Sequence, residues 1–185
     1  MTQSQLLLFE DNFIYPKSQL LDNVKGLIKM YEKGLLGGEV MPEDAKPDII
    51  AIDSRENYLF LTLPMALNYQ RNSYRLWEAA AKTYLDTETR QVFYPEIVVN
   101  MPDEILKESL LKYKLAIQPN KHVQIWRTLC ATLFNQFNGD IRQLFSNCNH
   151  DVIDIGNYVR VQYKQKFPYL SGHKIFNYWL HVMET

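Results

Sequence analysis

The stretch that most constrains the fold reads Phe167-Pro168-Tyr169-Leu170-Ser171-Gly172-His173-Lys174, and an apolar run over residues 175–183 follows it. The proline ends any preceding helix, and Gly172 lets the chain turn tightly into a new one. A helix start carries unpaired backbone N–H groups and the positive end of the helix dipole, so it can hold a phosphate. The stretch therefore predicts a tight loop that opens an anion-binding helix, with Lys174 as a phosphate contact or a nucleophile.

The segments upstream of this loop carry helical patterns. Apolar residues recur every three or four positions over 73–85 and over 122–137, which is typical of amphipathic helices. Asn138-Gly139 follows the second segment, and this pair readily adopts the left-handed conformation that ends a helix. Two long helices are thus expected, each with one apolar face.

Prolines mark further helix boundaries. Pro102 precedes two acidic residues and predicts a helix start, and Pro119 predicts its end. A helix over 151–164 is expected to lead to the terminal loop, with an apolar stripe formed by Val152, Ile155, Val159 and Val161. Together these patterns predict an all-α fold, a helical bundle.

The chain divides into an N-terminal extension, residues 1–55, and a helical domain, residues 56–185. A helix is expected over 18–36 within the extension, because apolar residues recur there at helical spacing up to a cluster of glycines. Residues 41–48 hold two prolines and three acidic residues, which indicates a surface loop. Residues 49–52 are expected to form a short strand or an extended segment that packs on the domain.

Charge is distributed unevenly along the chain. The formal net charge is −1, but residues 1–105 hold 10 Lys and Arg against 16 Asp and Glu, whereas residues 106–185 hold 10 against 5. A basic half is consistent with a face for a polyanion, since phosphate binding needs local rather than global charge. Ordinary variation of surface charge is the alternative.

Other sequence features exclude several classes of protein. No stretch is long and apolar enough to span a membrane and none resembles an export signal, so we expect a cytoplasmic protein with no membrane partner. Cys130 and Cys148 lack the spacing of a metal site, and Cys130 is expected to be a small buried thiol. The four histidines also lack ligand spacing and are expected to be exposed. We therefore expect no metal cluster and no cofactor; the oligomeric state stays unknown.

Three segments in order resemble parts of the helix-hairpin-helix DNA glycosylase superfamily, the group that contains endonuclease III. Residues 66–79 are similar to its "leu-leu-ser-x-gln" helix end and the helix that follows. Residues 113–140 are similar to its second loop, the helix after it and an "asn-gly-glu" turn. Residues 167–174 occupy the place of the "leu-pro-gly-val-gly-x-lys" hairpin, with Leu170 replacing the first glycine. The resemblance covers about two-thirds of the chain.

The resemblance implies a partner and a set of site residues. The partner is duplex DNA, held through the hairpin residues Ser171, Gly172 and His173. Lys174 aligns with the catalytic lysine that forms a Schiff base with the sugar. Gln70 corresponds to the side chain that fills the gap left by a flipped base, and Asn120 and Lys121 lie in the second insertion loop.

The catalytic pattern is incomplete. The family's aspartate lies in the loop after the second hairpin helix, and these residues do not include that loop. We therefore expect either a fragment of an enzyme or a protein that does not cleave by that mechanism. Tyr69, Tyr74 and Trp77 are expected to line a base pocket or to belong to the core.

The sequence is compatible with three functions. The first is a domain of a base-excision repair glycosylase or lyase that is inactive or truncated before its aspartate. The second is a DNA-binding module without chemistry. The third is an unrelated helical interaction protein.

Overall fold

The computed structural model describes residues 17–33 and 41–183. None of these residues forms a β-strand, which confirms the all-α prediction. The chain separates into two compact units, Met1–Val40 and Met41–Thr185. Residues 41–55 thus group with the helical domain, whereas the sequence placed them in the extension. Their contacts explain the grouping, because Lys46 Nζ donates to Asn57 Oδ1 and Ile50 is buried.

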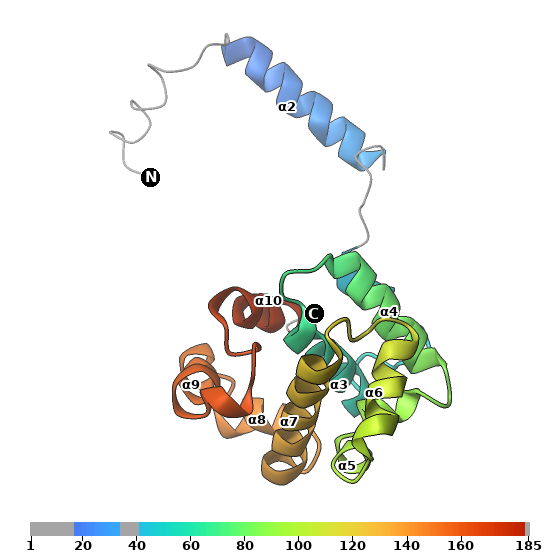
Figure 1. The fold of residues 1–185 in the computed structure, drawn as a ribbon. Coiled ribbons are helices and arrows are strands. Elements are labelled where there is room, and N and C mark those ends of the chain that lie inside the picture. Colours follow the sequence, from blue (N-terminus) through green and yellow to red (C-terminus); the bar gives the residue numbers. More distant parts are fainter. Residues whose placement is uncertain (1–16, 34–40, 184–185) are drawn as a thin grey trace. The chain divides into compact units, whose positions relative to one another are not determined.

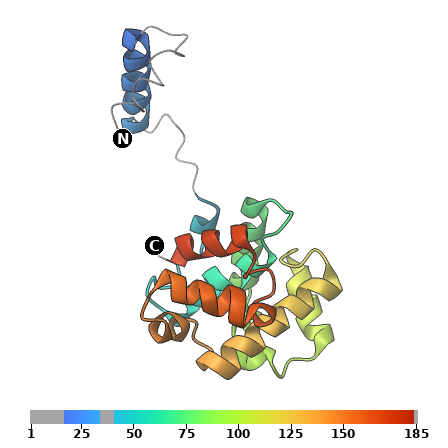
Figure 2. The same cartoon turned by 90° about the vertical axis from the view of Figure 1, so that its left-hand side faces the viewer.

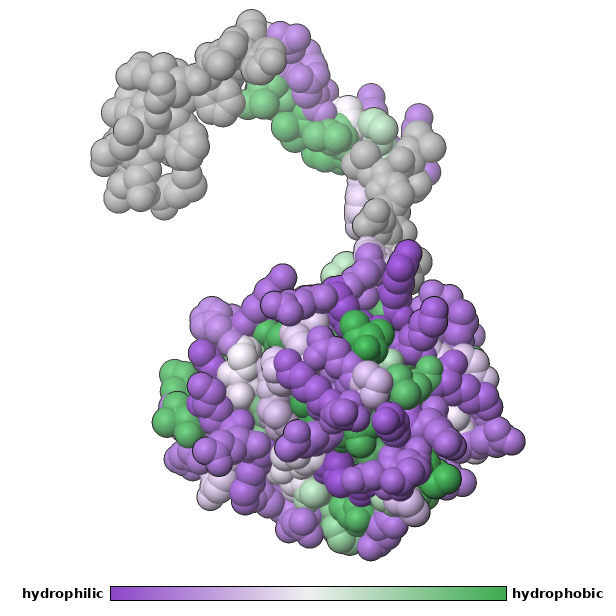
Figure 3. Space-filling view, in the orientation of Figure 1, coloured by the Kyte–Doolittle hydropathy of each residue, from purple (hydrophilic) through white to green (hydrophobic). Residues whose placement is uncertain are grey.

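The described part of the first unit is the helix α2, Lys17–Glu32. Its apolar side chains are exposed, among them Leu21 and Leu27. The helix is labelled in Figure 1, and Figure 3 shows hydrophobic surface along it. The predicted helix over 18–36 is confirmed as far as Glu32, and its predicted end at the glycines lies outside the described residues.

The second unit is built from short and long helices in the following order: η1 Pro42–Ala45, α3 Arg55–Thr62, η2 Pro64–Leu67, α4 Ser73–Leu85, η3 Arg90–Phe93, α5 Pro95–Val98, α6 Asp103–Lys112, α7 Pro119–Phe137, α8 Arg142–Asn147, α9 Val152–Gly156, η4 Asn157–Gln162, η5 Lys164–Lys166 and α10 His173–Met183. Segments η1, η2, η3 and η5 are 3-10 turns, and η4 is a π-helix. The helix predicted over 151–164 is therefore interrupted. Residues 49–52 form turns rather than a strand.

Large aromatic side chains fill the core between α3, α4 and α7. Phe60 contacts the rings of Trp77 and Phe93 at centroid distances of 5.7 and 5.6 Å. The ring of Trp126, from α7, meets Phe93 edge-on at 5.5 Å and donates its indole N–H to the Val92 carbonyl oxygen. All these rings are essentially inaccessible to solvent. Such packing supplies most of the stability of a helical domain of this size.

The predicted bounds of α4 and the predicted end of α7 are reproduced, but α6 already ends at Lys112, and Pro119 begins α7 instead of ending the helix before it. Helix α4 has the predicted bounds, and Asn72 caps it by accepting the N–H of Arg75. Helix α7 ends at Asn138 and Gly139, whose φ values are 50° and 75°. Cys130 is buried and its thiol is free, as predicted.

Helix α10 lies beside α9 and η4 in two views of the molecule (Figures 1 and 2). It also packs against α3, and its Trp179 indole N–H donates to Thr62 Oγ1. This contact fixes the helix that the terminal loop opens. The start of α10 therefore has a defined place on the second unit.

Candidate nucleic-acid interface

The hairpin loop, residues 167–172, is held by backbone hydrogen bonds and by two buried side chains. The N–H of Ser171 donates to the Phe167 carbonyl oxygen, and the N–H of Gly172 donates to that of Tyr169. Phe167 and Leu170 are fully buried. A Cβ atom at position 172 would lie 3.0 Å from the Tyr169 carbonyl oxygen, so the loop favours glycine there.

The strained residue of the loop is Tyr169, whose φ is 61°. The resemblance placed the missing glycine at Leu170, but Leu170 serves as a buried anchor. A non-glycine residue in the left-handed region costs about 1 kcal/mol, and such strain is often found at functional sites. The surrounding contacts of Tyr169 must therefore hold it in place.

The start of α10 presents unpaired backbone donors, as predicted. Among the described residues, the N–H groups of His173, Lys174 and Ile175 have no hydrogen-bond acceptor. The first turn contains no acidic residue, and the His173 and Lys174 side chains are exposed. These groups form a site that attracts an anion.

Ser171 and Gly172 were predicted to contact DNA directly, but their polar groups are used within the protein. The Ser171 side chain is buried, and its hydroxyl donates to the Lys164 carbonyl oxygen. The N–H groups of Ser171 and Gly172 are already used within the loop. The donors that stay available to a ligand therefore belong to the first turn of α10 rather than to the loop itself.

Lys174 is the predicted catalytic residue, and its side chain stands alone. It forms no ion pair with any residue in the described ranges 17–33 and 41–183. Nothing in its described surroundings steers it or removes its proton, as a nucleophilic lysine requires. Its exposed position in a helix start suits contact with a phosphate.

A stacked pair of tyrosines joins the hairpin to two other segments. The rings of Tyr69 and Tyr169 stack at a centroid distance of 3.9 Å and an interplanar angle of 13°. Lys121 Nζ, from the first turn of α7, lies 4.9 and 4.8 Å from the two centroids. The loop after η2, the start of α7 and the hairpin thus meet in the tyrosine–lysine cluster, which we define as Tyr69, Lys121 and Tyr169.

The distances also place the ammonium group of Lys121. Because Nζ is almost equally far from two rings that are stacked on each other, it lies at the edge of the pair and not over a ring face. A side-chain hydrogen bond to Tyr169 raises the pKa of Lys121 above its ordinary value. Burial raises the pKa of Tyr69, although Lys121 opposes the shift. The cluster therefore carries a stable positive charge at its surface.

Gln70 lies beside the cluster in an exposed loop and has a φ of 51°. The next residue, Arg71, fixes this loop to the segment before α7 by donating to the carbonyl oxygens of Leu115 and Lys114. Gln70 and the exposed Ile117 line one pocket of about 580 Å³. The structure therefore brings a polar and an apolar side chain together at the edge of the cluster.

His122 is buried, contrary to the prediction that the histidines are exposed. Its Nδ1 accepts the N–H of Ile117, and its ring meets Tyr69 edge-on at 5.5 Å. Burial lowers the pKa of His122 to about 4. A neutral His122 therefore supports both the loop before α7 and the tyrosine–lysine cluster. His150, His173 and His181 are exposed.

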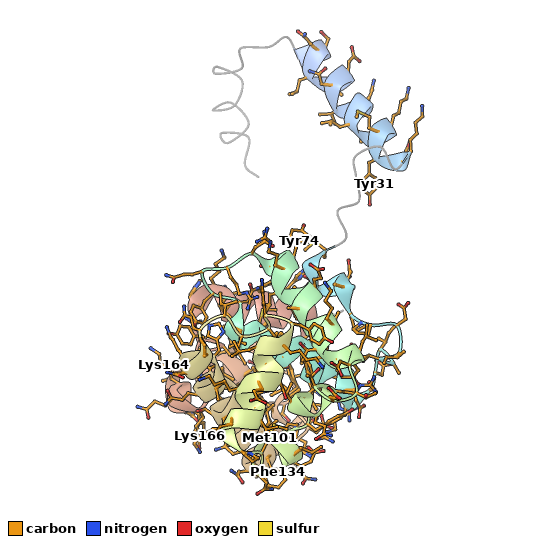
Figure 4. All side chains as sticks on the ribbon, turned by 45° about the vertical axis from the view of Figure 1, so that its right-hand side comes forward. Tyr31, Tyr74, Met101, Phe134, Lys164 and Lys166 are labelled. Atoms are coloured by element: carbon orange, nitrogen blue, oxygen red, sulfur yellow. The ribbon has the colours of Figure 1, made fainter. Side chains whose placement is uncertain are left out.

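The remaining candidates separate into surface and core. Asn120 is exposed on the first turn of α7, next to Lys121. Trp77 belongs to the core, whereas Tyr74 is 48% exposed at the surface of α4 (Figure 4). Trp77 packs against Phe60 in the core, and Tyr69 is the aromatic candidate whose ring forms part of the cluster.

The positions of the acidic residues in the sequence also indicate this face. Three runs, 57–77, 109–139 and 155–183, contain none of the 21 Asp and Glu residues but 10 of the 20 Lys and Arg residues. Each run supplies one member of the tyrosine–lysine cluster. Tyr169, Arg71 and Ile117 lie within these runs, although the sequence did not single them out as site residues.

No protein-family model, curated protein or solved structure matches the chain. Among the described residues, no group of three or more His, Cys, Asp or Glu side chains is arranged to hold a metal ion. The helices of the same residues also lack the combination of length and apolar character that crossing a bilayer requires.

Proposed function

We propose that the second unit binds duplex DNA through its sugar–phosphate backbone, as a helix-hairpin-helix module. One observation carries the proposal: three acid-free runs far apart in the sequence meet at the tyrosine–lysine cluster, beside the helix start that has free N–H groups. Most contacts between proteins and DNA go to the backbone, through Lys, Arg and helix N-termini. The three runs supply these groups and no carboxylate, and Glu78, which lines the pocket of Gln70 and Ile117, is paired with Lys82.

Each part of the face has a role in this proposal. The N–H groups at the start of α10 hold one phosphate, and Lys174 adds its charge to the same contact. Lys121 meets a second phosphate, since its ammonium lies at the edge of the tyrosine pair and is exposed. Gln70 and Ile117 line one pocket, and the apolar side chain of Ile117 is the group proposed to enter a base step.

The proposal assigns Lys174 to binding and not to catalysis. A Schiff base requires a lysine that loses its proton and a carboxylate that supports the developing charge. The described surroundings of Lys174 provide no carboxylate. We therefore expect that borohydride traps no covalent complex between the protein and abasic-site DNA, and that Lys174→Ala gives the same result. A trapped complex that needs Lys174 would instead establish a lyase.

Salt dependence tests the binding itself. The affinity for a 16-base-pair duplex should fall as salt rises, because binding releases counterions. Lys174→Gln and Lys121→Gln should each lower the slope of log affinity against log salt by roughly 0.9, the value for one phosphate contact. Lys29→Gln, at an exposed lysine of α2, is the matched control and should leave the slope unchanged. Absence of binding at low salt, or equal slopes in all four proteins, contradicts the proposal.

A further inference from the structure

A groove of about 1090 Å³ runs between α9, η4 and the hairpin. One wall consists of α9 and η4, and the other consists of the loop at 168–172 and the first half of α10. These elements lie side by side in both ribbon views (Figures 1 and 2). The ring of Phe176, on α10, is buried in the groove wall.

Aliphatic side chains line the groove and are exposed. Ile153 and Val161 are each 73% exposed, the highest values of the large apolar residues in the described part of the second unit, and Val152 is 51% exposed. Apolar surface is visible at this edge of the unit (Figure 3). The sequence groups Val152 and Val161 in an apolar stripe with Ile155 and Val159, and the structure buries only the latter two. Clustered exposed apolar residues of this kind indicate a site for a partner.

The charges of the groove have one sign. Arg160 and Lys164 line it, and its lining contains no Asp or Glu. The Arg160 guanidinium lies 5.5 Å from the centroid of the Phe176 ring, so a positive charge is held directly beside apolar surface. Lys164 reaches out from the same edge of the unit (Figure 4).

The wall that carries Arg160 and Val161 is a π-helix, Asn157–Gln162. Such segments are rare and are frequent at functional sites, because they break the regular register of a helix. After this segment, the wall continues as the short turn η5 rather than as a regular helix. The groove thus ends beside Lys164 instead of being closed by a further helical turn.

We propose that this groove binds an acidic, amphipathic helical segment of a protein partner. Apolar side chains of the segment pack on Val152, Ile153 and Val161, and its carboxylates meet Arg160 and Lys164. This mode of recognition places the apolar face of a helix in a hydrophobic groove. A nucleic-acid strand fits less well, since bases stack on aromatic rings and the exposed lining is mainly aliphatic.

The groove and the proposed DNA face share Tyr169, Ser171, Gly172 and His173. Where the proposed DNA binding also holds, a bound peptide and a duplex exclude each other at the start of α10. The peptide can be tested without DNA, so the two proposals can fail independently.

The test uses synthetic 16-residue helical peptides and the whole chain. The first peptide carries leucines at helical spacing with glutamates between them. The second carries lysines in place of the glutamates, and the third carries serines in place of the leucines. A dT12 oligonucleotide is the fourth probe. Fluorescence anisotropy is expected to show binding of the first peptide at least tenfold tighter than binding of the other three probes.

Variants then locate the binding. Val161→Ser and Lys164→Glu are expected to weaken the first peptide at least fivefold each, because they remove an anchor and reverse a charge. Both positions are exposed, so the variants should keep the fold, which circular dichroism checks. Ile105→Ser on α6 and Lys29→Glu on α2 are the matched controls and should change nothing. The proposal is overturned if the first peptide does not bind, if dT12 binds more tightly, or if the groove variants and the controls behave alike.

Discussion

The aromatic core and the surface around the tyrosine–lysine cluster differ in how their residues are held in place. In the core, Phe60, Trp77 and Trp126 have helical or turn backbones and pack ring against ring. At the face, Gln70 and Tyr169 have left-handed backbones, and their side chains are partly or fully exposed. The core is stable because its local preferences agree with its packing, whereas the face is held against local preference by contacts from distant segments.

This difference has a functional meaning. Strained residues persist only where the surrounding structure holds them, and they concentrate at binding sites. Lys114, with a φ of 63°, adds a third left-handed residue next to the loop that Arg71 secures. The face is therefore expected to be easy to alter without unfolding the protein, and the core is not. The following predictions test that contrast, beginning with the largest effect.

The core should respond most strongly to truncation. Trp126→Ala is expected to lower the free energy of unfolding by about 3–5 kcal/mol, because it removes a fully buried ring and its hydrogen bond to Val92. Phe134→Ala is the control on the same helix and should cost about 1 kcal/mol or less, since Phe134 is partly exposed (Figure 4). Urea denaturation measures both. Equal costs at the two positions would remove the contrast between core and surface.

His122 should make the stability of the protein depend on pH. Its pKa is about 4 in the folded protein and about 6.5 in an unfolded chain. The unfolded chain therefore binds the proton more tightly, and stability is lost as the pH falls from 6.5 toward 4. The loss amounts to about 3 kcal/mol at most, by the relation of 1.36 kcal/mol per pKa unit.

His122→Asn isolates this contribution, because the Asn amide oxygen can accept the Ile117 N–H in place of Nδ1 and does not titrate. The variant should lose less stability than the natural protein between pH 6.5 and 4.5. Urea denaturation at a series of pH values measures the difference. Parallel curves for the two proteins would show that His122 is not the buried titrating group.

At position 169, a glycine variant should be more stable than an alanine variant, which is the reverse of the order in a helix. At a φ of 61°, Tyr169→Gly is expected to be about 1 kcal/mol more stable than Tyr169→Ala. In the middle of α7, Gln124→Ala should instead be about 1 kcal/mol more stable than Gln124→Gly. Thermal or urea denaturation of the four variants gives both differences. Finding the same order at both positions would refute the left-handed conformation of Tyr169.

Lys121 should contribute least to stability. Lys121→Gln is expected to change the free energy of unfolding by less than about 0.5 kcal/mol, because its ammonium is exposed. The same variant is expected to reduce DNA binding measurably, as the proposed function requires. A loss of stability of 2 kcal/mol or more would show that Lys121 is mainly a structural residue.

Much of the core could be predicted from the sequence, because hydrophobic periodicity and helix-ending residues act locally. Helix α4 and the end of α7 follow directly from Asn72, Asn138 and Gly139. The interruption of the helix over 151–164 could not be predicted, since the hydrophobic pattern does not distinguish an α-helix from the π-helix at Asn157–Gln162. Periodicity likewise groups Val152 and Val161 with Ile155 and Val159, but tertiary structure decides which of these four side chains are buried.

The candidate site was predicted in part. The pattern at 167–174 predicted the loop and the helix start, because proline and glycine constrain the backbone by themselves. The stacking of Tyr69 on Tyr169, and the burial of His122 behind it, joins segments up to 100 residues apart. Local sequence patterns do not predict a contact between segments so far apart. The acid-free runs are the one sequence signal that links the three segments, and they indicate the charge of the face but not its geometry.

The most direct test of the central claim is a nuclear magnetic resonance titration of the ¹⁵N-labelled protein with a short DNA duplex. The claim is that one face, built from three distant segments, contacts the DNA backbone. The account predicts that the amide signals of Gln70, Lys121, His173, Lys174 and Ile175 shift together and saturate at the same DNA concentration. Signals that do not move, or shifts confined to another surface such as α2 or α6, would contradict it.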